Sequence, residues 1–222
     1  MSRNIKTILF DLDGTLIDTN ALIHASFKHT FDVYGYQFSD EEIKQFNGPP
    51  LEQTFKKLHA EAADEMIQTY REHNLANHNL FVKLFPEVKM TLEKLKHRGI
   101  DMGIVSTKKR SGVELGLEFT GLMKYFNTII TFDDIEQAKP HPEPVLKAMH
   151  EMNAIKEYTL MVGDNYHDIE SGKNASIQTA GVAWSQKGAS FLETYQPTYM
   201  LQNMADLLEL TEVFVDAKDK TI

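Results

Sequence analysis

Two carboxylates follow a short apolar segment near the start of the chain. The stretch LFDLDGTLIDT at positions 9–19 places Asp11 and Asp13 two residues apart, directly before Gly14. At this spacing on an extended backbone, the two side chains point to the same side. Neighbouring buried carboxylates repel one another, and they keep their charges only beside a cation or with one of them protonated. The pair therefore predicts a site for a cation, a proton or a reaction.

Further polar residues follow later apolar segments in the same way. They are Ser106 and Thr107 after 101–105, Lys139 in the loop after 128–131, and Asp164 with Asp168 after 158–162. In open parallel sheets, ligands bind at the edge where the strands end. We therefore expect these side chains to meet Asp11 and Asp13 at one edge of a sheet.

Each of these residues also has a purely structural interpretation. A loop carboxylate pair or a helix N-cap would account for Asp11 and Asp13, and a helix cap for Ser106, Thr107 and Asp168. Asp164 is typical of a turn, and Lys139 of a solvated lysine before a proline. For each residue taken singly, the structural alternative stays open. The order of these residues at the ends of successive strands favours a shared site.

The expected cluster has the groups that phosphoryl transfer requires. Several carboxylates form the oxygen-rich environment that suits Mg²⁺. A carboxylate such as Asp11 can attack phosphorus to give an aspartyl-phosphate, provided that Mg²⁺ and Lys139 offset the repulsion between the anions. Ser106 can donate a hydrogen bond to a phosphate oxygen. Asp13 is placed to give a proton to the leaving oxygen and to take one from water.

The composition disfavours several other classes of protein. The chain has 222 residues, enough for one domain with an insertion, and its formal charge of −9 disfavours nucleic acid and anionic membranes as partners. It has no cysteine, which excludes disulfides and thiolate sites. We find no signal peptide and no run of about 20 apolar residues that would span a membrane. These features fit a cytoplasmic protein.

The spacing of apolar residues indicates the elements that position the cluster. We expect strands at 5–10, 101–105, 128–131, 158–162, 178–183 and 199–201, and helices such as 143–152 and 168–175. Short apolar strands that alternate with helices predict a parallel sheet covered on both faces.

The segment after the first strand has the three- and four-residue spacing of helices instead. A first helix should end at Gly35, and Ser39 with Glu42 forms a capping box for a second. Gly48-Pro49-Pro50 then breaks the chain before a third helix, and Met66, Ile67, Tyr70 and Leu80 mark a fourth. The sequence thus predicts an α/β core with a helical insertion.

The ordered motifs resemble those of the haloacid dehalogenase-like superfamily, in its phosphatase branch. The family's DxDGT motif is similar to residues 11–15, and its Ser or Thr at a strand end to Ser106. Its Lys-Pro motif resembles Lys139-Pro140, and its GDxxxD motif resembles 163–168. Two departures concern phosphate positioning: the second motif more often reads Thr-Asn-Lys than Ser106-Thr107-Lys108, and the fourth more often has Ser in place of Asn165.

This resemblance implies a Rossmann-like parallel-sheet core, residues 1–17 and 82–222, with an inserted α-helical cap domain, residues 18–81. It implies Asp11 as nucleophile and Asp13 as general acid and base. Mg²⁺ would be held by the Asp11 side chain, the Asp13 backbone carbonyl and Asp164, with Asp168 in support. The residues expected to bind the substrate are Thr15, Gly48, Ser106, Thr107 and Lys139.

The cap loop indicates the substrate class. Residues 48–51 resemble the cap loop of phosphoglycolate phosphatases and of the related PpaX-type pyrophosphatases, and the segments ILFDLDGTLIDTN and NGPPLEQTF look closest to the pyrophosphatases. We therefore predict a Mg²⁺-dependent phosphohydrolase acting on a small phosphate compound, with inorganic pyrophosphate ahead of phosphoglycolate or another phosphomonoester. The alternatives are a β-phosphoglucomutase-like phosphotransferase and a non-catalytic interaction module. Pro49-Pro50 can equally be a plain helix breaker, and His141 an exposed loop residue.

Overall fold

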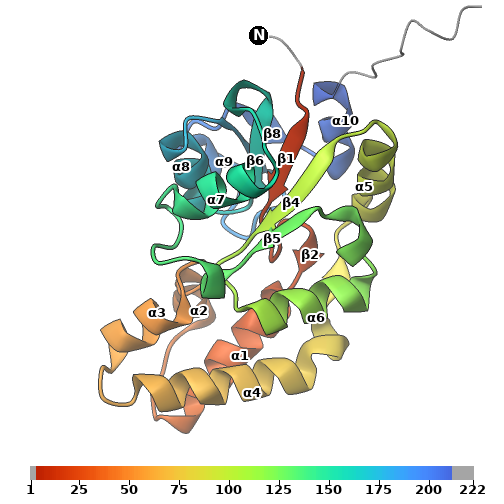
Figure 1. Cartoon of the computed structure of the whole chain (residues 1–222). Helices are drawn as coiled ribbons and strands as arrows, with labels where there is room; N and C mark the ends of the chain where they lie inside the picture. Colours follow the sequence, from red (N-terminus) through yellow and green to blue (C-terminus); the bar gives the residue numbers. More distant parts are fainter. Residues whose placement is uncertain (1–3, 212–222) are drawn as a thin grey trace, which may run out of the picture.

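A parallel sheet forms the centre of the protein. The structure, a computed structural model, describes residues 4–211 (Figure 1). In this part of the chain, six strands pair in the order β5-β4-β1-β6-β7-β8, all of them parallel. They are β1 (Thr7–Phe10), β4 (Asp101–Val105), β5 (Thr128–Ile130), β6 (Thr159–Gly163), β7 (Gln178–Val182) and β8 (Tyr199–Leu201). The α/β class and the parallel sheet predicted from the sequence are confirmed.

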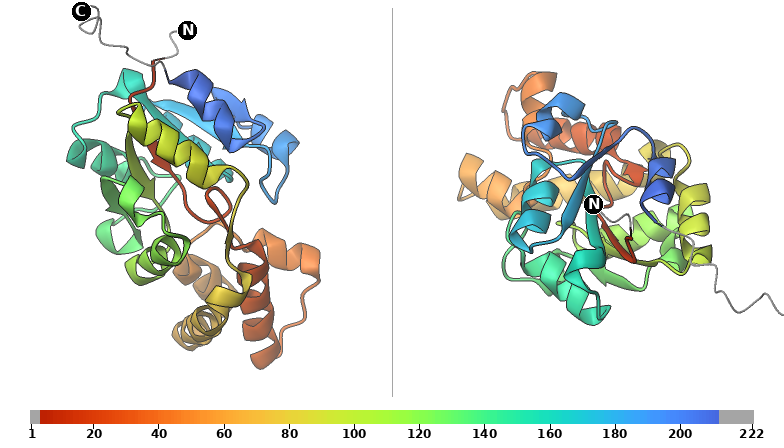
Figure 2. Two further views of the ribbon diagram at one scale, coloured as in Figure 1. Left: turned by 90° about the vertical axis from the view of Figure 1, so that its right-hand side faces the viewer. Right: turned by 90° about the horizontal axis from the view of Figure 1, so that it is seen from above.

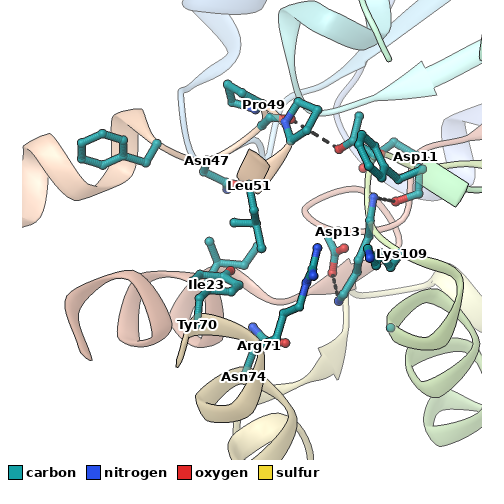
Figure 3. A pocket seen from close by; sticks show the side chains of 18 of the residues that line it. Asp11, Asp13, Ile23, Asn47, Pro49, Leu51, Tyr70, Arg71, Asn74 and Lys109 are labelled. Atoms are coloured by element: carbon teal, nitrogen blue, oxygen red, sulfur yellow. Dashed lines mark hydrogen bonds and ion pairs between the residues drawn. The ribbon is translucent and has the colours of Figure 1, made fainter. Parts of the chain in front are cut away.

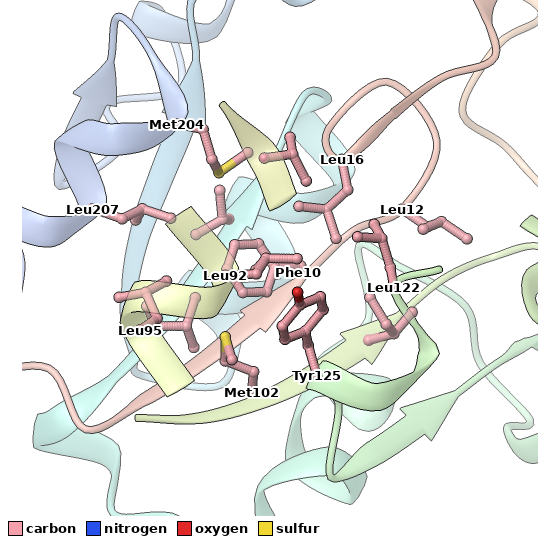
Figure 4. Close-up of a cluster of buried hydrophobic side chains, with 14 of the residues drawn as sticks. Phe10, Leu12, Leu16, Leu92, Leu95, Met102, Leu122, Tyr125, Met204 and Leu207 are labelled. Carbon is pink, nitrogen blue, oxygen red and sulfur yellow. The ribbon is translucent and has the colours of Figure 1, made fainter. Parts of the chain in front are cut away.

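Helices cover both faces of the sheet. Ile8 and Phe10 of β1 pack on one face, and Leu9 packs on the other, as the two-residue period of a strand requires. The first face is covered by α5 (Val88–His97), α6 (Arg110–Thr120) and α10 (Leu207–Leu210). Figure 4 shows Leu92 of α5 and Leu207 of α10 in the cluster around Phe10. The second face is covered by α7 (Glu143–Glu151) and α8 (Tyr166–Asn174), and α9 (Ala189–Glu193) lies beside β7. Burial on both faces explains why the strands read as continuous apolar runs.

A helical block lies at the end of the sheet where its strands finish (Figures 1 and 2). It consists of α1 (Asn20–Val33), α2 (Asp40–Gln45), α3 (Leu51–Leu58) and α4 (Ala63–Phe81). Its own core centres on Phe27, whose ring lies 5.7 Å from that of Phe55 and 4.8 Å from that of Tyr70. The capping box of Ser39 and Glu42 opens α2 as predicted. The domain boundaries at 18–81 stay a prediction.

The structure differs from the expected elements in small ways. β2 (Ile17–Asp18) and β3 (Lys83–Leu84) form an antiparallel pair where the chain enters and leaves the helical block. Two-residue strands carry no periodicity, so the sequence does not predict them. Leu80, expected on the buried face of the fourth helix, is 80% exposed in the last turn of α4. No helix within residues 4–211 is both long and apolar enough to span a membrane.

Candidate active site

The strand ends bring most of the predicted residues to one cavity. The cavity has a volume of about 290 Å³ and lies between the core loops and the helical block (Figure 3). Its lining includes the predicted residues Asp11, Asp13, Gly48, Ser106, Thr107, Lys139, Asp164 and Asp168. Thr15 does not line it, because its side chain is fully buried beside the turn and its carbonyl accepts a hydrogen bond from Trp184. His141 also lies outside the cavity lining and is 41% exposed, as expected of a loop histidine.

Lys139 is the buried cation of the site. Its ammonium donates to Oδ1 of Asp11 at 2.8 Å, to Oδ1 of Asp168 at 2.6 Å and to the carbonyl of Val105 at 2.9 Å. All three N–H groups are thereby used. Burial lowers the pKa of Lys139, but the two carboxylates outweigh it and raise that pKa above its usual value. The interpretation of Lys139 as a solvated lysine is wrong.

Asp168 serves the helix and the site together. Its Oδ2 accepts the backbone N–H of Asn165 at 3.0 Å, which completes a capping box at the start of α8. Its Oδ1 accepts from Lys139. The space for this carboxylate depends on Gly163, where a Cβ atom would lie 2.2 Å from Cγ of Asp168. The structural and functional interpretations of Asp168 are therefore compatible.

Three buried carboxylates form a cluster that fits a divalent cation. Oxygens of Asp11, Asp164 and Asp168 lie within 4.8 Å of one another. Burial raises the pKa of Asp11 to about 7; Lys139 counteracts this rise, and the charge of Asp168 adds to it. Burial, then the charges of Asp11 and Asp168, raise the pKa of Asp164 well above its usual value. One lysine does not balance three carboxylates, so hard oxygen ligands and excess negative charge favour a cation such as Mg²⁺ here.

Asp13 lies apart from this cluster. Its Oδ1 accepts a hydrogen bond from Lys108 at 3.2 Å, and its side chain is 17% exposed. In Figure 3 the side chain of Arg71 extends from the helical block towards Asp13. An acid in this place can reach the part of a substrate that points away from Asp11.

The cap loop lies directly on the core loops. The Thr107 hydroxyl donates to the carbonyl of Gly48 at 3.4 Å. Gly48 has a φ of +120°, and a Cβ atom there would lie 2.5 Å from Nδ2 of Asn165. The Ser106 hydroxyl accepts the N–H of Lys108 at 3.2 Å and does not cap α6, which begins at Arg110 after the N-cap residue Lys109. Glycine at position 48 is therefore required both by the backbone and by the contact.

Several residues of the cavity were not predicted from the sequence. They include Arg71, Lys109, Asn165 and His167, together with the Lys108 that holds Asp13. His167 accompanies the predicted acidic pair in the segment 163–168, and burial, the largest influence, lowers its pKa to about 4. Asn165 and His167 lie within four residues of the end of β6, and this position was a usable signal. No sequence signal marks Arg71, which lies in the middle of an amphipathic helix.

Comparison with known proteins places the chain in a family. Residues 8–182 match the model of the haloacid dehalogenase-like hydrolases. The chain is 56% identical to pyrophosphatase PpaX of Oceanobacillus iheyensis over 93% of its length and 97% of the relative's, and 51% identical to pyrophosphatase PpaX of Anoxybacillus flavithermus over 95% and 98%.

A solved structure extends the likeness to the fold. A haloacid dehalogenase-like protein from Bacteroides fragilis superposes with a TM-score of 0.86 at 29% identity, covering 92% of this chain and all of that one. The matched residues include the buried carboxylates and Lys139. This chain therefore belongs to the haloacid dehalogenase-like hydrolase family.

Proposed function

We propose that this hydrolase is a Mg²⁺-dependent pyrophosphatase that forms an aspartyl-phosphate on Asp11. The observation that carries the proposal is the buried contact of Lys139 with Asp11 and Asp168, beside Asp164. The choice of pyrophosphate is supported by the relatives at 56% and 51% identity, both named pyrophosphatases.

Asp11 is the nucleophile in this proposal. One of its carboxylate oxygens attacks the phosphorus, and the bond from phosphorus to the bridging oxygen breaks. Asp13 gives a proton to that leaving oxygen, so inorganic phosphate departs. Asp13, now a carboxylate, takes a proton from water, whose oxygen attacks the phosphorus, releases the second phosphate and restores Asp11.

The surrounding residues prepare Asp11 for this attack. The ammonium of Lys139, 2.8 Å from Asp11, offsets the repulsion between a carboxylate and an incoming phosphate. Ser106, 3% exposed, offers its hydroxyl to a phosphate oxygen. A Mg²⁺ ion held by Asp11, the Asp13 carbonyl, Asp164 and, in support, Asp168 would supply positive charge to the phosphoryl oxygens.

The helical block encloses the substrate in this proposal. Residues 18–81 act as a cap domain, and the contact of Gly48 with Thr107 closes the cavity on the core side. Closure excludes water other than the one that reacts.

Phosphate release tests the proposal. Wild-type protein is assayed with and without Mg²⁺ on pyrophosphate, phosphoglycolate, sugar phosphates and nucleotides, and pyrophosphate should give the highest kcat/KM, with EDTA abolishing turnover. Asp11→Asn should reduce release to background. Full turnover by Asp11→Asn would refute the nucleophile, and a preference for phosphoglycolate would keep the mechanism but replace the substrate. Sugar-phosphate isomerisation without free phosphate would support a phosphotransferase instead.

A further inference from the structure

Charge is unevenly distributed along the cavity. The carboxylates of Asp11, Asp164 and Asp168 lie together on the core side with Lys139 among them. The other cationic side chains of the lining lie around Asp13 and on the helical block: Lys108, Lys109 and Arg71. A small substrate whose phosphoryl group reacts at Asp11 would place its leaving group among these three cations.

Arg71 reaches into the cavity from the helical block. Figure 3 shows its side chain extending from α4 into the space between Leu51 and Asp13. Nη2 donates to Oε1 of Glu52 at 2.6 Å, and within residues 4–211 this is the only hydrogen bond of the guanidinium. Because a guanidinium carries five N–H donors in a planar fork, Arg71 retains donors for an anion.

Lys109 stands on the opposite wall. It is the residue before the first turn of α6, and its ammonium forms no ion pair with the described part of the chain. By contrast, Lys139 uses all of its donors, and Lys108 holds Asp13. Lys108 keeps N–H groups as well, but its ammonium is held at Asp13, whereas Arg71 and Lys109 present free donors from the two sides of the cavity.

We propose that Arg71 is the specificity-determining residue of this site: with Lys109, it binds a second anionic group that the substrate carries next to the reacting phosphoryl group. This inference rests on the proposed function. It defines the substrate class as small phosphate compounds with a second anionic group, which includes pyrophosphate and excludes phosphate esters of neutral alcohols.

The geometry explains why an arginine is used. A planar guanidinium makes two parallel hydrogen bonds to a phosphate or carboxylate, whereas an ammonium acts as a point charge. Glu52 holds Arg71 in the cavity by one nitrogen and leaves the rest of the fork available. An anion binding there also draws α4 towards the core wall that carries Lys109, so recognition and closure of the cap are coupled.

The test compares two substrates in one variant. Arg71→Gln should lower kcat/KM for pyrophosphate about 10- to 100-fold more than kcat/KM for glycerol phosphate, because the lost hydrogen bonds are made to a charged group. Arg71→Lys should show a smaller difference between the two substrates than Arg71→Gln, since lysine keeps the positive charge but lacks the planar guanidinium fork. Lys44→Gln removes a cap cation that lies outside the cavity and should leave the ratio unchanged.

A binding measurement separates this inference from the proposed function. Methylenediphosphonate, whose bridge resists hydrolysis, should inhibit the wild type competitively in the presence of Mg²⁺. Arg71→Gln should raise its Ki about tenfold or more, and should raise the Ki of inorganic phosphate much less. Equal losses for both substrates and both inhibitors would overturn the inference and make Arg71 a structural partner of Glu52. Absence of wild-type turnover on pyrophosphate would defeat the proposed function instead, and methylenediphosphonate binding would still test Arg71.

Discussion

The ammonium of Lys139 lies 2.6 Å from Oδ1 of Asp168, and the two side chains are only 3% and 1% exposed. The contact joins the loop after β5 to the first turn of α8. A buried ion pair contributes little net stability, because desolvation offsets the attraction. Its effect here is to fix Lys139 against Asp11 in one position.

Removal of Lys139 should damage both stability and activity. Lys139→Met keeps most of the side-chain volume but leaves Asp11 and Asp168 without their cation. We expect the free energy of unfolding at pH 7 to fall by about 3–5 kcal/mol in EDTA, and kcat to fall on the order of 100-fold or more. Urea unfolding and phosphate release measure the two effects.

A surface lysine provides the control for this change. Lys156→Met replaces an exposed lysine away from the cavity and should leave both quantities nearly unchanged. If Lys139→Met unfolded at the same urea concentration as the wild type, the assigned role of the buried cation would be wrong.

Stability should depend on pH and Mg²⁺ together. The pKa of Asp11 is about 7 in the folded protein, whereas an unfolded aspartate has its ordinary value near 4. Between these values the folded state holds a proton that the unfolded state has lost, so this group lowers the free energy of unfolding as pH rises from about 4 to about 7. The raised pKa of Asp164 acts in the same direction.

Bound Mg²⁺ should counteract this loss of stability at higher pH. Mg²⁺ competes with the protons on the carboxylates, so the stabilisation that it adds should grow as pH rises to about 7 and then level off. Urea unfolding at several pH values, in EDTA and in MgCl₂, measures the difference. Asp11→Asn should flatten the pH dependence in EDTA, and a Mg²⁺ effect that was the same at pH 5 and pH 8 would contradict the prediction.

The core and its site residues were predictable because they obey short-range rules. The apolar runs of β4 and β8 coincide with the predicted 101–105 and 199–201, since buried parallel strands are continuously apolar. Asp11, Ser106 and Asp164 meet because parallel strands end at the same edge of a sheet. The positions of these residues directly after predicted strands were therefore enough to predict much of the cluster.

The cap side of the cavity was not predictable in the same way. Arg71 is one of several polar residues on α4, and only the fold brings it opposite Lys109. Thr15 is the reverse case, because the resemblance of residues 11–15 to the family motif implied a substrate contact, whereas the turn buries its side chain away from the cavity lining. Both cases depend on tertiary packing, which spacing along the chain does not record.

The capping box of α2 should stabilise the helical block without touching the chemistry. The Ser39 hydroxyl accepts the N–H of Glu42 at 3.4 Å, and Glu42 accepts the N–H of Ser39 at 2.8 Å. Ser39→Ala should lower the free energy of unfolding by about 1 kcal/mol and leave kcat/KM close to the wild-type value. Thermal unfolding and phosphate release check this, and a large loss of activity would show that α2 positions the cap loop.

Two glycines of the helical block allow the effect of backbone strain to be separated from the effect of contact with the core. Gly35 and Gly48 have φ values of +76° and +120°, so alanine is strained at both positions. A Cβ atom at Gly35 meets nothing within 4 Å, whereas at Gly48 it would lie 2.5 Å from Nδ2 of Asn165. Both substitutions should lower the free energy of unfolding by about 1–3 kcal/mol.

Enzyme activity should distinguish the two alanine variants. Gly48→Ala pushes the cap loop away from the core, so kcat/KM for pyrophosphate should fall about tenfold or more, because the reacting groups lose their alignment. Gly35→Ala should lose stability with kcat/KM nearly intact. Equal activities for the two variants, measured well below their unfolding temperatures, would mean that the cap loop closes without the contact between Gly48 and Asn165.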